Sequence, residues 1–504
     1  MPCYKVKVKW GKENYPDVEV NTDEVPLVFK AQLFALTGVQ PERQKVMLKG
    51  TTLKDSDWGN IKLKDGVTVL MMGSKEEDVP TEPVEKTVFV EDMNESELAS
   101  ALELPAGLTN LGNTCYMNAT VQCLKTVPEL REALRDFQGA VTMASNMVPA
   151  QSITAALRNL YDEMDKGTSI PPIVLLQVLH MAFPRFAEKS EHGGFTQQDA
   201  NECWTELVRM LQQKLPPKKV DGQNVAFKSV VEQFFGGTFD VELKCNETEE
   251  ESPSYSKENF LQLSCFISQD VRYMQSGLKS KMQEQITKLS PTLERDAVYT
   301  KTSKISRLPA YLTVQFVRFY YKEKEAINAK ILKDVKFPLE FDAFELCSTE
   351  LQQKLTPMRS RFKEVEDKRV EEALLAKSDK NDKNKGDGSP KVKTKSIPYW
   401  FEGDLGSNNS GYYTLQAVLT HRGRSSSSGH YVAWVRQKGD TWIKCDDDQV
   451  SPVTSEEVLK LSGGGDWHCA YVLLYGPRVL EEPIEENGES LAVSASMDTT
   501  ATSQ

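Results

Sequence analysis

Residues 75–104 divide the chain into two parts that must fold separately. This stretch is rich in Glu, Asp, Pro and Ser, and such a composition cannot bury enough apolar surface to offset the entropy lost on ordering. We therefore predict a linker at 75–104 between a small unit over residues 3–74 and a large unit over residues 105–477. The final stretch, residues 478–504, is acidic and then rich in Ser and Thr, which predicts a disordered tail.

The small unit has the pattern of a compact α+β domain. Its first segment, YKVKVKW, alternates apolar and polar residues as a half-buried strand does. A second strand, a helix over residues 27–37 ended by Gly38, and two more short strands follow. The segment PERQKVMLKGTTLKD resembles ubiquitin, which implies a β-grasp, ubiquitin-like domain over residues 3–74. By this resemblance Met47 falls at the centre of ubiquitin's binding face; the alternative is one more apolar strand residue.

The large unit shows one interruption in its apolar pattern. Residues 352–396 carry mixed charges, and their second half has almost no core-forming side chains. We predict a charged helix near 361–376 followed by a disordered insertion.

Composition and cysteine spacing exclude several classes of function. The net charge of −12 suits a phosphate backbone poorly, so we expect no nucleic-acid partner. No apolar run is long enough to span a membrane. The nine cysteines are scattered and include no C-x-x-C pair, which indicates a reduced, intracellular protein and not a disulfide framework. We expect the protein in the cytoplasm, with the nucleus as a second compartment.

A cysteine at the start of a helix is the best candidate for a nucleophile. In GLTNLGNTCYMNATVQCLKTV, apolar residues recur at helical spacing from Cys115 onward, and Asn113 or Thr114 can serve as the N-cap. The free N–H groups and the positive dipole end of that turn favour a thiolate over a thiol. An ordinary buried cysteine is the alternative, and Cys123 and Cys203 fit that description because both lie on apolar helix faces.

Among the five histidines, His430 stands out because its hairpin ends in carboxylates. It begins the segment GHYVAWVRQKGDTWIKCDDDQV, in which two strands flank a turn. A turn centred on residues 438 and 439 places His430 opposite Asp447, with Asp446 one place away. A carboxylate on the far ring nitrogen would fix the tautomer and stabilise the imidazolium. The register does not select one residue of the run Asp446–Asp448, since a slip of one position changes the partner.

Four ordered segments resemble the ubiquitin-specific proteases, a family of cysteine deubiquitinases. GLTNLGNTCYMNA resembles their cysteine box, and GHYVAWV with WIKCDDDQV resembles their histidine box. FTQQDANECWTELV and LPAYLTVQFVRF match two further segments. The resemblance implies a papain-like thumb, palm and fingers fold for residues 105–477. With the ubiquitin-like domain, the chain looks most similar to the proteasome-associated members.

The same resemblance implies roles for individual residues. Cys115 becomes the nucleophile and His430 the general base and then acid. Asp446 becomes the residue that orients the histidine, with Asp447 as a secondary candidate. Asn110 is assigned to the oxyanion hole, where a side-chain amide would meet the charge on the carbonyl oxygen; a loop residue that binds its own backbone is the alternative.

Residues that would bind the C-terminal tail of ubiquitin also follow from the family: Gln197, Gln198, Asp199, Gly429 and Tyr431. The first three lie at the exposed start of a helix predicted over 196–211, where Thr196 and Asp199 fit a capping box. An acidic residue at 199 would attract the basic tail, although a role as cap alone stays open. Tyr431 lines the tail channel or packs in the core.

The sequence predicts no metal and no other cofactor. Many members of the family bind zinc through two C-x-x-C pairs in the fingers, whereas this chain has only the single residues Cys245 and Cys265 there. We expect hydrolysis of isopeptide bonds at the C-terminal glycine of ubiquitin, which would trim polyubiquitinated proteins. The ubiquitin-like domain would dock to the 26S proteasome regulatory particle. Two alternatives stay open: a non-catalytic module that binds ubiquitin chains and regulates the proteasome, and a transglutaminase, which also uses Cys, His and Asp.

Overall fold

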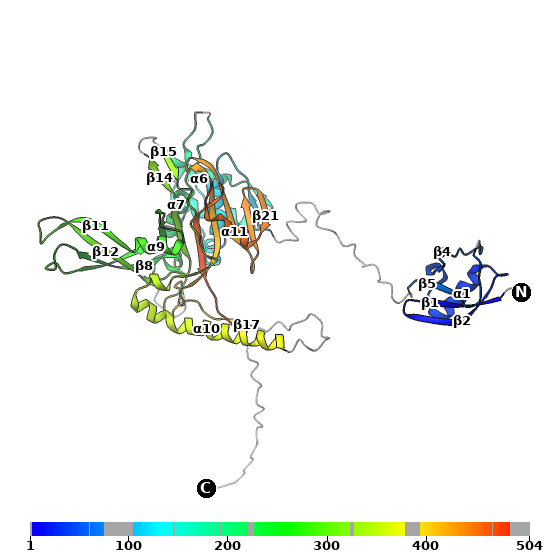
Figure 1. Ribbon diagram of the computed structural model, residues 1–504. Helices are drawn as coiled ribbons and strands as arrows, with labels where there is room; N and C mark the ends of the chain where they lie inside the picture. Colours follow the sequence, from blue (N-terminus) through cyan, green and yellow to red (C-terminus); the bar gives the residue numbers. More distant parts are fainter. Residues whose placement is uncertain are drawn as a thin grey trace, which may run out of the picture. The chain divides into compact units, whose positions relative to one another are not determined.

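The computed structural model describes nine stretches of the chain, residues 3–59, 61–74, 104–144, 147–191, 193–219, 226–322, 327–378, 394–465 and 467–483. They belong to two compact units, one within Met1–Met93 and one within Asn94–Gln504 (Figure 1). The linker predicted at 75–104 lies outside the described residues except for its last residue, and so does the predicted tail from residue 484 onward. None of the described helices has the length and apolar content of a membrane-spanning segment.

The N-terminal unit is a five-stranded sheet with one helix. Its strands pair in the order β2-β1-β5-β3-β4, with bounds β1 (Cys3–Trp10), β2 (Glu13–Asn21), β3 (Lys45–Leu48), β4 (Thr51–Thr52) and β5 (Thr68–Met72). Only β1 and β5 run parallel among these neighbours. Helix α1 (Pro26–Thr37) ends at Gly38, as predicted, and the φ of 73° at this glycine forms a left-handed cap. Val6, Phe29 and Leu33 form part of the core between helix and sheet.

The helices of the large unit include one that is completely buried. They are α3 (Cys115–Leu124), α4 (Pro128–Asp136), α5 (Pro149–Met164), α6 (Ile173–Ala182), α7 (Ala200–Lys214) and α8 (Val230–Phe235), followed later by α9 (Met274–Lys281), α10 (Thr349–Ser378) and α11 (Ser455–Leu459). Every residue of α3 is buried. This helix packs against α7 and against strands β18, β19 and β20, so its first residue is held on all sides.

A ten-stranded sheet supports α3. Its main path runs β10-β13-β22-β18-β19-β20-β21, with bounds β10 (Leu263–Phe266), β13 (Leu312–Val317), β18 (Tyr412–Ser425), β19 (Ser428–Arg436), β20 (Trp442–Asp446), β21 (Gln449–Val453) and β22 (Cys469–Pro477). Strands β14 (Phe319–Lys322), β15 (Ile327–Lys330) and β16 (Glu340–Asp342) join beside β18. The pair β6 (Gly107–Leu108) and β7 (Ser169–Ile170) lies outside this sheet.

Strand β19 serves two cores at once. Tyr431, Ala433 and Val435 pack with the helices, whereas Val432 and Trp434 join the core on the opposite face of the sheet. Alternate side chains of a strand point to opposite faces, so a strand buried on both faces reads as a continuous apolar run. This burial fixes the strand that carries His430.

A four-stranded sheet extends from the body of the large unit, at β8, β11 and β12 in Figure 1. Its order is β11-β12-β8-β9, with bounds β8 (Gly237–Cys245), β9 (Ser254–Phe260), β11 (Gln283–Ser290) and β12 (Arg295–Arg307). The Tyr299 hydroxyl donates to both carboxylate oxygens of Glu251, at 2.8 and 2.9 Å. Cys245 belongs to this sheet and Cys265 to the ten-stranded one, so the two cysteines do not share a strand pair.

The predicted interruption at 352–396 differs from the structure at both of its ends. Helix α10 begins at Thr349, well before the predicted start at 361, because Leu355 and Phe362 are buried in the core. In the sequence, charged residues around Leu355 and Phe362 obscure the helical spacing of these two apolar side chains. Strand β17 (Thr394–Ser396) pairs with β23 (Glu481–Pro483), so the predicted disordered tail begins with ordered residues. Residues 379–393 lie outside the described part.

Candidate active site

Cys115 is the first residue of helix α3 and is buried, with 2% of its surface exposed. Thr114 occupies the N-cap position, but its hydroxyl accepts a hydrogen bond from the Leu111 N–H at 2.9 Å and does not cap the helix. Asn113 has a φ of 56°, in the left-handed region, and turns the loop into the helix. The predicted helix start is therefore correct, whereas the expected side-chain cap is absent.

His430 and Asp446 form a close pair beside this thiol. The Nε2 atom of His430 lies 2.6 Å from Oδ1 of Asp446, while the nearest oxygen of Asp447 is 4.0 Å away. A hydrogen bond with Asp446, and to a smaller extent one with Cys115, raises the pKa of His430 to about 10. Because Nε2 is hydrogen-bonded to Asp446, Nδ1 is the ring nitrogen left to hydrogen-bond the thiol of Cys115. The backbone N–H of Tyr431 also donates to the sulfur of Cys115, at 3.5 Å.

The hairpin register differs from the predicted one by one residue. Ala433 pairs with Cys445, and the paired ladder between β19 and β20 stops there. His430 therefore reaches Asp446 diagonally instead of facing Asp447. The chain turns sharply after β20, where Asp447 has a φ of 54°. A register shift of this size depends on the turn geometry, which the residue types of the turn do not fix.

Asp447 binds two asparagines of the cysteine segment. Asn110 donates to its Oδ2 at 2.9 Å, and Asn118 donates to its Oδ1 at 2.8 Å. Its carbonyl oxygen accepts from the N–H of Leu108 at 2.9 Å. Burial raises the pKa of Asp447. These contacts fasten the turn after β20 to the loop that carries the cysteine, so one turn positions both halves of the site.

The sequence reasoning missed Asn118. It lies one helical turn after Cys115 and is 2% exposed. A buried asparagine needs hydrogen-bond partners, but the residue pattern around Asn118 shows neither its burial nor its partner. Asn110 was predicted, and its Oδ1 accepts from the backbone N–H groups of Gly112 at 3.0 Å and Thr114 at 3.2 Å. The oxygen of the Asn110 side chain thus holds the loop in shape, and one N–H of its amide donates to Asp447.

Asp199 caps helix α7, which begins at Ala200. The capping box predicted at Thr196 is therefore wrong. Oδ1 of Asp199 accepts from two N–H groups of the first turn, at 2.7 and 3.2 Å. The Tyr471 hydroxyl donates to both carboxylate oxygens, at 2.8 and 2.9 Å, and burial raises the pKa of the acid. The side chain of Asp199 is therefore fully engaged within the protein, as a cap would be.

The segment before α7 lies against the cysteine loop, since Asn113 donates to the Phe195 carbonyl at 2.9 Å. Gln197 is buried, and its Nε2 has no hydrogen-bond partner among the described residues. Gln198 donates to the hydroxyl of Thr196 at 2.8 Å. A buried amide donor without a partner is unusual in a folded protein.

Gly429 and Tyr431 lie on either side of the histidine. Tyr431 is 1% exposed and packs against the rings of His421 and Tyr471, with centroids at 4.7 and 6.3 Å. Gly429 has a φ of 110°, and a Cβ there would meet the Arg422 carbonyl at 2.1 Å. Glycine is therefore required at this position for β18 and β19 to approach.

Two other histidines lie near the site and are poor candidates for the base. Burial lowers the pKa of His421 and of His468 to about 3. Both rings are therefore neutral at physiological pH, in contrast to His430. His468 packs edge-on against His430, with centroids 6.4 Å apart, and forms part of the wall of the site.

One group of side chains in the described residues has donor atoms close enough to hold a metal ion, namely His430, Asp446 and Asp447. These atoms already engage each other, Lys444 and two asparagines. We therefore assign no metal to them.

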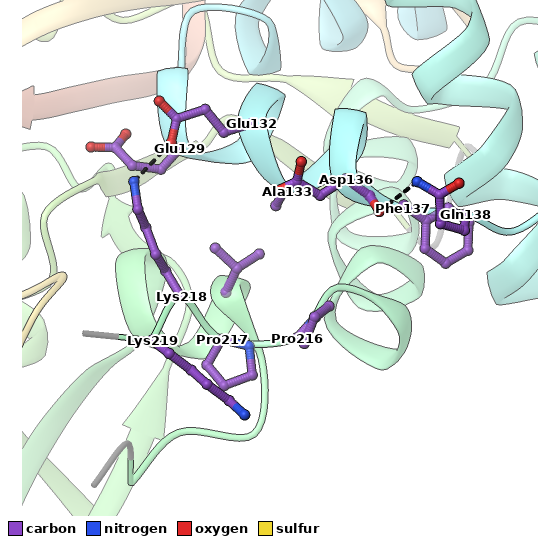
Figure 2. Close-up of a pocket in the computed structure, with 11 residues that line it drawn as sticks. Glu129, Glu132, Ala133, Asp136, Phe137, Gln138, Pro216, Pro217, Lys218 and Lys219 are labelled. Atoms are coloured by element: carbon purple, nitrogen blue, oxygen red, sulfur yellow. Dashed lines mark hydrogen bonds and ion pairs between the residues drawn. The ribbon is translucent and has the colours of Figure 1, made fainter. Parts of the chain in front are cut away.

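A cavity of about 400 Å³ lies elsewhere, between helix α4 and the segment at 216–219 (Figure 2). Glu132 and Lys218 form an ion pair at 2.8 Å in its wall. It is lined by Glu129, Glu132, Ala133, Asp136, Phe137, Gln138, Pro216, Pro217, Lys218, Lys219 and Val230. No residue predicted for the site lines it.

Comparison with known proteins identifies the family. The sequence model of the family described as "Ubiquitin carboxyl-terminal hydrolase" matches residues 106–475. Ubiquitin carboxyl-terminal hydrolase 7 of Arabidopsis thaliana is 42% identical over 483 residues, which cover 94% of this chain and 99% of that protein. Ubiquitin carboxyl-terminal hydrolase 14 of Caenorhabditis elegans is 43% identical over 487 residues, covering 95% and 94%.

A solved structure supports the fold of the large unit. The "SAGA Ubp8/Sgf11/Sus1/Sgf73 DUB module bound to ubiquitin aldehyde" contains a chain that is 21% identical, with a TM-score of 0.50, covering 74% of this chain and 69% of that chain. At this identity the likeness concerns the fold, and it agrees with the catalytic fold predicted for residues 105–477. The chain therefore belongs to the ubiquitin carboxyl-terminal hydrolase family, the cysteine proteases that remove ubiquitin.

Proposed function

We propose that this deubiquitinase hydrolyses the isopeptide bond at the C-terminal glycine of ubiquitin with Cys115, His430 and Asp446 as its catalytic set. The observation that carries the proposal is the His430 ring, which binds Asp446 at 2.6 Å and also hydrogen-bonds the Cys115 thiol. A nucleophile, a base and a group that orients the base are the parts that thiol hydrolysis requires.

The reaction then proceeds in two steps. The thiolate of Cys115 attacks the glycine carbonyl, and the oxyanion binds Asn110 and the N–H at the helix start. The departing lysine amine takes the proton held by His430, and the C–N bond breaks. Water then attacks the thioester, with His430 accepting its proton and returning it to the sulfur. Both bond changes balance without a cofactor.

The tail of ubiquitin would approach along the residues assigned to it. Gln197 supports this proposal because its buried Nε2 has no partner among the described residues and could donate to the tail backbone. Gln198 and Gly429 would line the same channel, whereas the side chain of Tyr431 is buried in the core and follows the alternative considered for it. Asp199 would supply negative charge toward the basic tail, in addition to its role as cap.

A ubiquitin probe with a C-terminal electrophile tests the catalytic assignment. The unmodified enzyme should be labelled, and Cys115→Ala should not. Cys3→Ser removes an exposed cysteine of the N-terminal unit and should leave labelling unchanged. Labelling of Cys115→Ala at another cysteine would overturn the assignment. Binding of ubiquitin chains without hydrolysis by either form would favour the non-catalytic module, whereas equal, measurable hydrolysis by both forms would exclude Cys115 as the nucleophile.

We infer further that residues 3–74 form a ubiquitin-like domain that docks to the 26S proteasome regulatory particle, so that the enzyme trims ubiquitin from proteasome-bound substrates. The strand order around helix α1 supports this. Met47 lies opposite Leu70 in the sheet, and the neighbouring Leu70 and Met72 are 41% and 50% exposed. An exposed apolar patch of this kind is typical of an interaction surface. We expect the protein in the cytoplasm and the nucleus, where proteasomes act.

A further inference from the structure

Asp446 is held by both of its carboxylate oxygens. Oδ1 lies 2.6 Å from Nε2 of His430, and Oδ2 lies 2.8 Å from Nζ of Lys444. Lys444 and Asp446 are two positions apart in β20, so their side chains point to the same face of the sheet. The carboxylate is thus clamped between a histidine on one strand and a lysine on its own strand.

Lys444 is itself held in place by an aromatic side chain. It pairs with Trp434 across β19 and β20, and its ammonium lies 5.8 Å from the centre of the indole ring. The indole N–H donates to the hydroxyl of Thr420 at 3.0 Å, and Trp434 is almost fully buried. An ammonium near an aromatic face is attracted by the partial negative charge of that face. The lysine therefore has a defined position and not merely a flexible surface contact.

We propose that Lys444 is a positioning residue for the reaction. It holds Asp446 by the oxygen that His430 does not use, and it limits how strongly that carboxylate retains the proton on the imidazole. The inference rests on the proposed catalytic set. His430 must hold a proton when the thiolate forms and must release it to the leaving amine. A carboxylate alone helps His430 to hold its proton. A carboxylate that also binds a fixed cation holds the proton less tightly, so that His430 can both keep it and release it.

The charges around the pair support this division. Hydrogen bonds with His430 and Lys444 hold the pKa of Asp446 well below its usual range, against burial that raises it. Asp447 adds a second negative charge on the same turn, and His468 faces the pair in its neutral form because its pKa is lowered. Cys115 contributes the thiol on the other side of the ring. The positive charge of Arg422, on β18, helps to lower the pKa of His468. The cation that contacts Asp446 itself is Lys444.

The test compares Lys444→Met, which keeps the aliphatic stem, with Lys444→Arg, which keeps the charge. The matched control is Lys354→Met, an exposed lysine on α10. For hydrolysis of ubiquitin with a fluorogenic C-terminal amide, Lys444→Met should lower kcat by on the order of tenfold with KM unchanged. The basic limb of its pH–rate profile should move up by roughly one pH unit, since a positive charge near the imidazolium is lost. Lys444→Arg should restore the limb, and Lys354→Met should match the unmodified enzyme.

Alkylation of the thiol by iodoacetamide supplies a readout that needs no ubiquitin. The pH profile of the alkylation rate should also move to higher pH in Lys444→Met. Unchanged kcat and superimposable profiles would overturn the proposal. A loss of activity with a lower thermal unfolding midpoint and no movement of either profile would show a merely structural role and would overturn it too. Cys115→Ala is assayed in parallel: if it retains hydrolysis, the proposed function fails, whereas an inactive Cys115→Ala beside an unaffected Lys444→Met refutes only the lysine.

Discussion

Asn110 donates its side-chain amide to Asp447 at 2.9 Å, although 337 positions separate the two residues. The contact joins the loop before the nucleophile to the turn after β20, and Asn118 adds a second amide at 2.8 Å. The proposed oxyanion donor and the turn that follows the histidine's partner are therefore positioned together. Removal of the carboxylate should loosen both.

We expect Asp447→Ala to lower kcat by roughly 10²-fold, the usual cost of a lost oxyanion donor. Asn110 would lose its acceptor and no longer present its amide in a fixed direction. The KM for ubiquitin should change little, because the ubiquitin-binding surface stays intact. Steady-state hydrolysis of a fluorogenic ubiquitin substrate measures both. The control is Asp448→Ala, which removes an exposed neighbour; equal effects of the two variants would contradict this account.

The close approach of Gly107 to the same turn leads to a second prediction. A Cβ at Gly107 would lie 2.5 Å from the carbonyl oxygen of Asp448. Gly107→Ala should therefore displace the turn and cost about 1–3 kcal/mol of stability, with a loss of activity. Urea unfolding of the large unit measures the first and substrate hydrolysis the second. Gly465→Ala is the control, because a Cβ there meets nothing within 4 Å; it should be neutral.

The pairing of His430 predicts a pH dependence of stability. Hydrogen bonds with Asp446 and Cys115 raise its pKa from 6.5 to about 10. A histidine whose folded pKa is raised contributes stability that is complete below its unfolded pKa and is lost as the pH rises through the folded one. The difference in unfolding free energy between the unmodified enzyme and His430→Ala should therefore shrink between pH 6.5 and pH 10. A difference that stays constant over this range in urea titrations would contradict the pairing.

The N-terminal unit gives a prediction about docking. Replacing Met47 and Leu70 by Glu should abolish co-sedimentation with purified proteasomes, because it places charge in an exposed apolar patch. Labelling by the ubiquitin probe should be unchanged. Leu36→Glu on α1, where the side chain is 47% exposed, is the control. Loss of co-sedimentation in that variant alone would move the docking surface to the helix.

Part of this architecture could be predicted from residue patterns. The helix that begins at Cys115 and the hairpin that follows His430 both depend on local periodicity, and both are present. The choice between Asp446 and Asp447 could not be made from the hairpin, because it depends on a register set by the turn. The role of Asn118 was hidden for another reason: its partner is 329 positions away.

Helix ends were predicted less well than helix cores. Helix α7 begins four residues after Thr196, because Asp199 provides the cap with its own side chain. Helix α10 begins earlier than expected, because tertiary burial of Leu355 and Phe362 outweighs the charged sequence around them. In both cases the boundary is decided by contacts that the local pattern does not contain.

The two roles considered for Asp199 can be separated by Asp199→Asn. Asparagine is as good an N-cap as aspartate, so a residue that acts only as a cap tolerates the change. If Asp199 also attracts the basic tail of ubiquitin, the variant should raise KM by about tenfold while the thermal unfolding midpoint stays the same. The increase should be much smaller for ubiquitin in which a tail arginine is replaced by leucine, because the charge partner is already gone. Asp199→Ala serves as the comparison, since loss of the cap should cost about 1 kcal/mol of stability. Unchanged KM in Asp199→Asn would assign the residue to the helix alone and leave the electrostatic attraction of the tail to other groups.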